Sequence, residues 1–204
     1  IERDRAGQPW FLTFEWIGEI DYLNEGKDGA ARKRGANATA ADAAVTYRTV
    51  AGSTNLLLIE WKYTESYGQP LDSKGNPTRR SRYDRIYRAP AGPIRTDAEV
   101  LLDDFFYEPF YQMLRQQMLA WHTQRKVAGI DRARVLHLSP SGNRPLHKVT
   151  SPALRRFGDD AFGVFRSLLT DPEDFIGMSI EHAFAQLAGW PEADWYPWLR
   201  DRYV

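Results

Sequence analysis

The sequence contains no cysteine, which excludes disulfide bonds and metal sites built on thiolate ligands. It also has no excess charge of either sign, because 27 lysine and arginine residues balance 27 aspartate and glutamate residues. Any contact with an anionic partner must therefore come from a local basic surface. No apolar run approaches the roughly 20 residues that span a bilayer, and no signal peptide is visible. We expect a cytoplasmic protein that does not bind membranes.

Several motifs of common enzyme classes are missing as well. The four histidines lack H-x-x-x-H spacing, and there is no P-loop, no G-x-S-x-G and no dinucleotide fingerprint. No internal repeat divides the chain, and its 204 residues are enough for one domain with a sizeable core. We therefore treat residues 1–204 as a single domain.

A buried strand is predicted at Leu56–Lys62, which reads LLLIEWK. A continuous apolar run of this kind is typical of a strand covered on both faces. Because side chains alternate along a strand, Glu60 and Lys62 point to one face and Trp61 to the other. A carboxylate and an ammonium group therefore share one place at the rim of the sheet.

A second strand, Asp42–Tyr47, is predicted to pair antiparallel with the first through a turn at Gly52. A turn centred on Gly52 sets Asp42 opposite Lys62 and Glu60 opposite Ala44. Both acids and the lysine then lie on one face. A slip of one residue would move Asp42 to the other face, so the prediction depends on the register.

Two adjacent carboxylates predict a cation site, because Asp42 and Glu60 would repel each other without one. Their oxygens, with the Trp61 carbonyl as a third ligand, suit Mg²⁺, for which Mn²⁺ can substitute. Such an ion activates a bound water and stabilises charge on a phosphodiester, while Lys62 orients that water. The pattern alone is weak, since a solvated ion pair at a strand end would use the same residues.

Three segments in order carry a resemblance to a known family: RGANATAADAAV (34–45), LLLIEWKYTESY (56–67) and FFYEPFYQMLRQQMLAW (105–121). They resemble the PD-(D/E)XK nuclease superfamily, with Asp42 as its first acid and Glu60-Trp61-Lys62 as its E-x-K. More closely, they look like a bacterial family of proposed restriction endonucleases within it. The usual proline before the first acid is Ala41 here.

The resemblance implies a restriction-endonuclease-like α/β core, a mixed central sheet flanked by helices. Its core order would be helix, three strands, helix, strand. It also implies a magnesium-dependent nuclease that cuts DNA, in defence against foreign DNA, with RNA as the other substrate left open. Cutting both strands would favour a homodimer. The alternative function is a catalytically silent nucleic-acid-binding or assembly module on the same fold, and a third is a hydrolase of small phosphate esters.

Further site residues follow from the family's two core helices. The apolar stripe in Trp10–Leu23 predicts the first helix. Superfamily nucleases often supply an extra acid from this helix, and of Glu15 and Glu19 we choose Glu19, although both also fit ordinary exposed acids. The second helix is predicted at Phe110–Lys126, with Pro109 in its first turn. On it, Gln112 and Gln116 form one i, i+4 pair.

In related nucleases a glutamine on the second helix arranges the site, and we choose Gln116. Arg115 is a candidate phosphate ligand. The rival account is that this helix only covers the sheet.

A basic insertion is predicted at 68–95, an excursion of low regularity. Its centre, RRSRYDRIYR (79–88), interleaves arginines with Tyr83 and Tyr87, which suits phosphate contact and base stacking. The alternative is a short amphipathic helix whose tyrosines pack inward and whose arginines are solvated. The predicted nucleic-acid contacts are Arg79, Arg80, Arg82, Arg85, Arg88, Arg115 and, in a basic loop at 25–37, Arg34.

Two predictions concern the rest of the chain. Ala133–Leu138 reads as a strand parallel to an earlier one, with His137 as a core histidine. Residues 152–204 read as a helical C-terminal extension, in which Trp190, Trp195 and Trp198 pack against the core rather than form a stacking platform.

Overall fold

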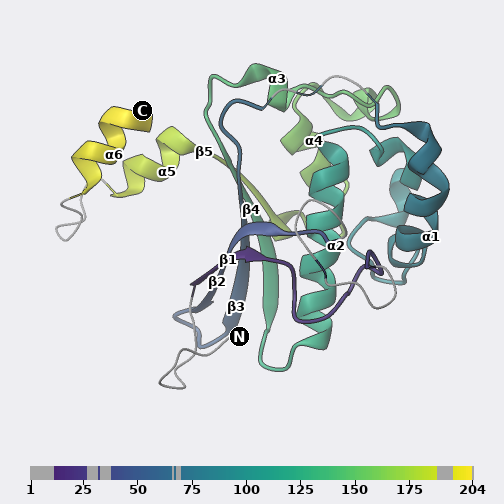
Figure 1. Cartoon of the computed structure of the whole chain (residues 1–204), viewed down its shortest axis with the longest axis horizontal. Helices are drawn as coiled ribbons and strands as arrows, with labels where there is room; N and C mark the ends of the chain where they lie inside the picture. Colours follow the sequence, from purple (N-terminus) through teal and green to yellow (C-terminus); the bar gives the residue numbers. More distant parts are fainter. Residues whose placement is uncertain are drawn as a thin grey trace.

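The structure, a computed structural model, describes residues 12–26, 32, 38–65, 67, 70–187 and 195–203. Trp10, Arg34 and Trp190, which the sequence singled out, lie outside these residues. Within the described part, the chain forms one five-stranded sheet with helices on both sides (Figure 1).

The sheet has the strand order β1-β2-β3-β4-β5. Its strands are β1 (Leu12–Trp16), β2 (Ala41–Arg48), β3 (Thr54–Trp61), β4 (Arg132–Ser139) and β5 (Phe175–Ser179). The first three pair antiparallel, and β4 and β5 continue from β3 in parallel. The mixed α/β sheet is therefore confirmed, with the predicted buried strand at its centre.

The helices and turns of 3-10 helix lie between and after the strands. They are η1 (Ser73–Gly75), α1 (Asn76–Tyr87), η2 (Thr96–Ala98), η3 (Leu102–Phe105), α2 (Phe110–Lys126), α3 (Arg144–His147), η4 (Ala153–Phe157), α4 (Ala161–Ser167), η5 (Pro172–Asp174), α5 (Ile180–Leu187) and α6 (Tyr196–Tyr203). In Figure 1, α1, α2 and α4 lie on one side of the sheet and α5 and α6 on the other. No helix in the described ranges is long and apolar enough to cross a bilayer.

Helix α2 crosses over between the parallel strands β3 and β4, and its predicted bounds are confirmed. Its fully buried face includes Met113, Leu114 and Met118, which pack into the main core between the sheet and α1, α2 and α4. A second, smaller apolar cluster around Leu138 and Phe184 lies under α5 and α6. The main core thus fixes α2 against the face of β3 that carries the polar strand end.

The segment Leu12–Trp16 is a strand, so the helix predicted over Trp10–Leu23 is wrong in its described part. Leu12, Phe14 and Trp16 alternate with polar residues, a period of two that suits a strand. Aromatic residues also favour strands, and β2 offers its free edge as a partner. A helix could not continue through this segment, because Gly18 has a φ of 79°, which lies outside the right-handed helical region.

The hairpin of β2 and β3 differs by two residues from the predicted register. Ala44 lies opposite Leu58, and the N–H of Thr49 donates to the carbonyl of Ser53 at 2.8 Å, which centres the turn on Ala51. Because the shift is an even number of residues, every side chain keeps its predicted face. One more step along the register sets Asp42 opposite Glu60.

The basic insertion contains α1, so the predicted low regularity is wrong, and its tyrosines pack inward as the helical alternative expected. Tyr83 is fully buried and the hydroxyl of Tyr87 donates to the carbonyl of Val100 at 2.5 Å. These tyrosines pack against the core together with Ile86, because the three are the large apolar side chains of a mostly polar helix. Base stacking by Tyr83 is therefore excluded in this structure.

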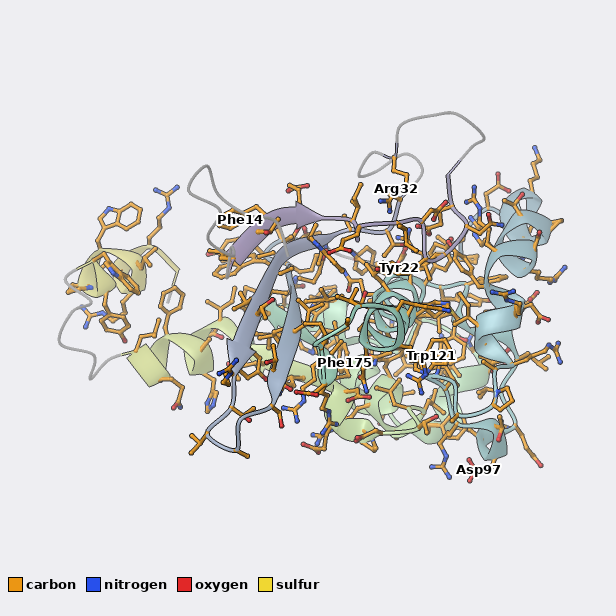
Figure 2. All side chains as sticks on the ribbon, turned by 90° about the horizontal axis from the view of Figure 1, so that it is seen from below. Phe14, Tyr22, Arg32, Asp97, Trp121 and Phe175 are labelled. Atoms are coloured by element: carbon orange, nitrogen blue, oxygen red, sulfur yellow. The ribbon has the colours of Figure 1, made fainter. Side chains whose placement is uncertain are left out.

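The segment 152–204 is helical in α4, α5 and α6 as predicted, but it also supplies β5. Phe175 of β5 packs edge to face against Phe162 and Phe165 of α4. Figure 2 shows Phe175 in the interior, whereas Phe14 lies at the margin of the molecule. The segment therefore completes both the sheet and the main core.

The tryptophans of the C-terminal segment depart from their predicted packing. Trp195 and Trp198 are 44% and 62% exposed. Tyr196 and Leu199 contact the second apolar cluster instead, because an amphipathic helix presents only one face to its neighbours.

Candidate active site

Glu60 lies at the end of β3 and faces α2, where it is only 1% exposed. The Nζ atom of Lys62 lies 2.6 Å from its Oε1. Burial raises the pKa of Glu60, the hydrogen bond and charge of Lys62 oppose this effect, and the negative charge of Asp42 reinforces it. The carboxylate of Asp42 is therefore close enough to influence the ionisation of Glu60.

Asp42 is tied to the backbone of the E-x-K segment. Its Oδ2 accepts a hydrogen bond from the N–H of Trp61 at 2.7 Å. The N–H of Lys62 in turn donates to the carbonyl of Leu138 at 2.8 Å, which continues the pairing with β4. The predicted grouping of Asp42, Glu60 and Lys62 at one rim of the sheet is thus what the structure contains.

Two glutamines of α2 hold the carboxylate of Glu60. Gln112 Nε2 donates to Oε1 at 2.5 Å, and Gln116 Nε2 donates to Oε2 at 2.6 Å. The residues are four apart and so lie on one side of the helix. Gln116 was chosen from the sequence and lies at the site. Gln112 was passed over, although the i, i+4 spacing to Gln116 was the signal that pointed to it.

The carboxylates of Glu60 and Asp42 offer oxygen ligands that suit a magnesium ion. Three of the four lone-pair positions of the Glu60 carboxylate take hydrogen bonds from Lys62, Gln112 and Gln116, which leaves one for a cation. No group of three acidic or histidine side chains in the described residues is arranged to hold a metal ion. Two carboxylates and no nitrogen or sulfur donor fit magnesium, which keeps several waters.

Glu108 is a further carboxylate near the site that the sequence did not single out. It lies two residues before the start of α2, and its Oε2 accepts the N–H of Gln112 at 3.1 Å. Burial raises the pKa of Glu108, against the opposing charges of Arg115, Lys62 and Arg79. In sequence it was one of five acids between Asp97 and Glu108, and only the folded chain distinguishes it from the rest.

His137 of β4 is a core histidine, as predicted. It lies beside Glu60 in the parallel pairing, is 1% exposed and packs at 4.6 Å against the ring of Phe162. Burial lowers its pKa to about 3, and the charges of Lys62 and His147 add to the effect. The ring is therefore neutral beside the site.

The acids weighed for the extra site position lie in different places. Glu19 is exposed in a bend after β1, where its charge adds to the burial that raises the pKa of Tyr22. Glu15 lies in β1 between residues that pair with Ala43 and Ala41, so the register sets it opposite Asp42. Since the segment is a strand, its acids no longer share one helical face.

The arginines predicted to contact nucleic acid have unlike surroundings. Arg80 and Arg88 form ion pairs with Asp103 and Asp84. Arg82 donates to the carbonyl of Glu25 at 3.0 Å. Their charges are thus largely engaged within the protein.

Arg85 is exposed and forms no ion pair with a described residue. It lines an open groove of about 1000 Å³ between α1 and α2, to which Trp121 also contributes. Figure 2 shows Trp121 on the side of α2 that faces α1.

Arg79 and Arg115 of this set contact the same aromatic ring of α2. Both guanidinium groups lie over the ring of Tyr111, at 5.4 and 4.6 Å from its centroid. Arg115 also lies 3.7 Å from the buried carboxylate of Glu25.

A protein-family model described as "Restriction Endonuclease associating with ARP" matches residues 2–204. No curated protein and no solved structure matches the chain.

Proposed function

Since the chain belongs to this family of restriction endonucleases, we propose that it is a metal-dependent nuclease that hydrolyses phosphodiester bonds in DNA, in a defence role. The observation that carries the proposal is the grouping of Asp42, Glu60 and Lys62 at the rim of β3, with both oxygens of Glu60 held by α2. The family match agrees with the resemblance read from the sequence.

Asp42 and Glu60, with the Trp61 carbonyl, would hold Mg²⁺ or Mn²⁺. When bound, the ion supplies an activated water and stabilises charge on the phosphate. The ammonium group of Lys62 orients the attacking water and offsets negative charge that develops on the phosphate oxygens. Gln112 and Gln116 are positioning residues, because they fix the Glu60 carboxylate before substrate arrives.

The buried carboxylate favours an active enzyme over a catalytically silent module. Burying the Glu60 carboxylate beside Asp42 costs free energy, as the raised pKa of Glu60 indicates. A pair of acids that opposes folding is typical of a functional site. A module that only binds would gain stability from losing one of them.

The family description names an association with ARP. We extend this association to the present chain as a proposal. A homodimer is a second proposed assembly, since two active sites would cut both strands.

The test is cleavage of supercoiled plasmid with Mg²⁺, with Mn²⁺ and with neither. We expect nicked or linear product only with metal, and a loss of at least about 100-fold in Lys62→Ala and Asp42→Asn. Lys74→Ala, which changes an exposed lysine of η1, is the matched control and should cut at the wild-type rate.

Unfolding curves of each variant would separate lost chemistry from lost structure. Cleavage by Asp42→Asn at the wild-type rate would contradict the assignment of the site. Binding of DNA by the wild type without cleavage in either metal would favour the silent module.

A further inference from the structure

Two arginines from different elements are stacked on one ring beside the site. Arg79 comes from α1 and Arg115 from α2, and both lie over Tyr111. Tyr111 immediately precedes Gln112, whose side chain holds Glu60. Both guanidinium groups therefore lie against the turn of α2 that also carries Gln112.

Unlike Arg80 and Arg88 of α1, Arg79 forms no ion pair with a carboxylate of the described residues. Its Nη1 donates to the carbonyl of Asp72 and to Asn76 Oδ1, both at 2.7 Å. No described residue accepts from its Nε or Nη2, and neither atom is among the buried polar atoms that lack a partner. No described residue therefore engages these two donors, and the bonds of Nη1 set the orientation of the guanidinium group.

Three positive charges act on one place, the carboxyl group of Glu108. Arg115, Lys62 and Arg79 each work against the burial that raises the pKa of this group. Glu108 precedes Tyr111 by three residues and contacts the backbone of Gln112, so its carboxylate lies at the same turn of the chain as the ring that holds Arg79 and Arg115. Within the described residues, the carboxylate takes one hydrogen bond, from the N–H of Gln112.

We propose that Arg79 and Arg115 clamp a phosphate of the nucleic-acid backbone next to the one that is cut, and that the Glu108 carboxylate competes with this phosphate for their charge. Arginine suits the role because its planar, permanently charged group donates two parallel hydrogen bonds to phosphate. The inference rests on the proposed nuclease function and names contacts of the same site.

The clamp also accounts for how a chain of zero net charge would hold an anionic polymer. Arg80 and Arg88 are engaged by Asp103 and Asp84, so α1 offers less free positive charge than its sequence implies. The unpaired guanidinium of Arg79 lies at the end of α1 that meets Tyr111. Phosphate contact is thus concentrated beside the catalytic residues.

The experiment measures DNA binding by fluorescence anisotropy in a chelating buffer, at salt concentrations between about 50 and 200 mM. Loss of one phosphate contact weakens binding to all sequences and lowers the slope of log affinity against log salt by about 1. We expect this change in Arg79→Ala. Arg79→Lys should keep the wild-type slope, because lysine retains the charge.

Two further variants complete the set. Glu108→Gln should bind DNA several-fold more tightly than the wild type, since it removes the competing charge while its amide oxygen still accepts the N–H of Gln112. Arg200→Ala, an exposed arginine of α6 on the other side of the sheet, is the control and should keep affinity and slope.

Each outcome bears on the clamp. A wild-type slope and affinity in Arg79→Ala, in a protein that cuts plasmid, would overturn the clamp and leave the nuclease standing. Weaker binding by Glu108→Gln would overturn the competition. A wild type that neither binds nor cuts DNA would overturn the clamp together with the proposed function.

Discussion

Glu60 shows at the scale of single residues how the site is held. A buried carboxylate is tolerated only when its oxygens are hydrogen-bonded, and here two amides and an ammonium group supply those bonds. The alternation of side chains in β3 predicted that Glu60 and Lys62 share a face. The glutamines that complete the site come from a helix about 50 residues later, as the separations of 52 and 56 residues show.

The adjacent buried glutamines 116 and 117 test this positioning role. Gln116→Ala should lower kcat by about 10- to 100-fold with little change in KM, because the Glu60 carboxylate loses the hydrogen bond that orients its Oε2. Gln117→Ala is the matched control, since Gln117 is equally buried on the same helix and its Oε1 has no partner. Steady-state cleavage of an oligonucleotide measures both. Equal losses of kcat would mean that the cavity, and not the contact with Glu60, is responsible.

Asp42 reached the correct face although the predicted register was wrong by two residues. A shift by an even number of residues leaves the side chains of a strand on the same faces. The face on which Asp42 lies therefore depended only on whether the register error was even or odd. Glu19 was misplaced for the opposite reason, since a change from helix to strand alters which acids are neighbours. Glu108 carried no periodic signal and had to be found in the fold. The catalytic roles of these residues stay predictions.

At the scale of the elements, α2 was predicted to the residue and β1 was not recognised. In α2 the proline at its start and a long apolar stripe agree on one structure. In Leu12–Trp16 the same five residues fit either period, and pairing with the edge of β2 decides for the strand. The secondary structure of a short segment is ambiguous, because a few residues cannot distinguish the periodicity of a helix from that of a strand.

The role of β5 can be tested by truncating one of its side chains. Phe175→Ala should lower the free energy of unfolding by about 3 to 5 kcal/mol, because Phe175 is 1% exposed between two aromatic rings of α4. Trp198→Ala, at an exposed position of α6, is the control and should change it by about 0.5 kcal/mol or less. Urea unfolding followed by circular dichroism measures both. A small effect of Phe175→Ala would mean that β5 is not part of the cooperative core.

For the whole molecule, the balance of charge hides strong local differences. The 27 positive and 27 negative residues sum to zero, yet many of the arginines are paired with acids along the surface. Inside the protein, His137 is held neutral beside Glu60 and Lys62. Stability therefore depends on pH through buried groups more than through net charge.

His137 predicts a loss of stability in mild acid. Its pKa is about 3 in the folded protein, against about 6.5 in an unfolded chain. Between these pH values the unfolded state binds a proton that the folded state does not bind. The contribution of His137 to the free energy of unfolding is complete above pH about 6.5. It is lost as the pH falls towards 3, by up to about 1.4 kcal/mol per pH unit.

Urea unfolding between pH 6.5 and 5 checks this expectation. His137→Leu should remove about one proton's worth of the pH dependence, whereas His182→Gln, at an exposed histidine, should keep it. The same pH dependence in wild type and His137→Leu would show that other groups are responsible.

The sequence by itself determined the central strand, the parallel strand after α2, the bounds of α2 and the shared face of Asp42, Glu60 and Lys62. These features follow from hydrophobic periodicity and from glycine and proline residues at the ends of elements, which are signals within a few neighbouring residues. Only the tertiary structure decided that α2 closes on Glu60, that β1 and β5 extend the sheet, and which arginines are already paired. Contacts between residues far apart in the chain depend on how whole elements pack, and the spacing of residues in one segment does not contain that information.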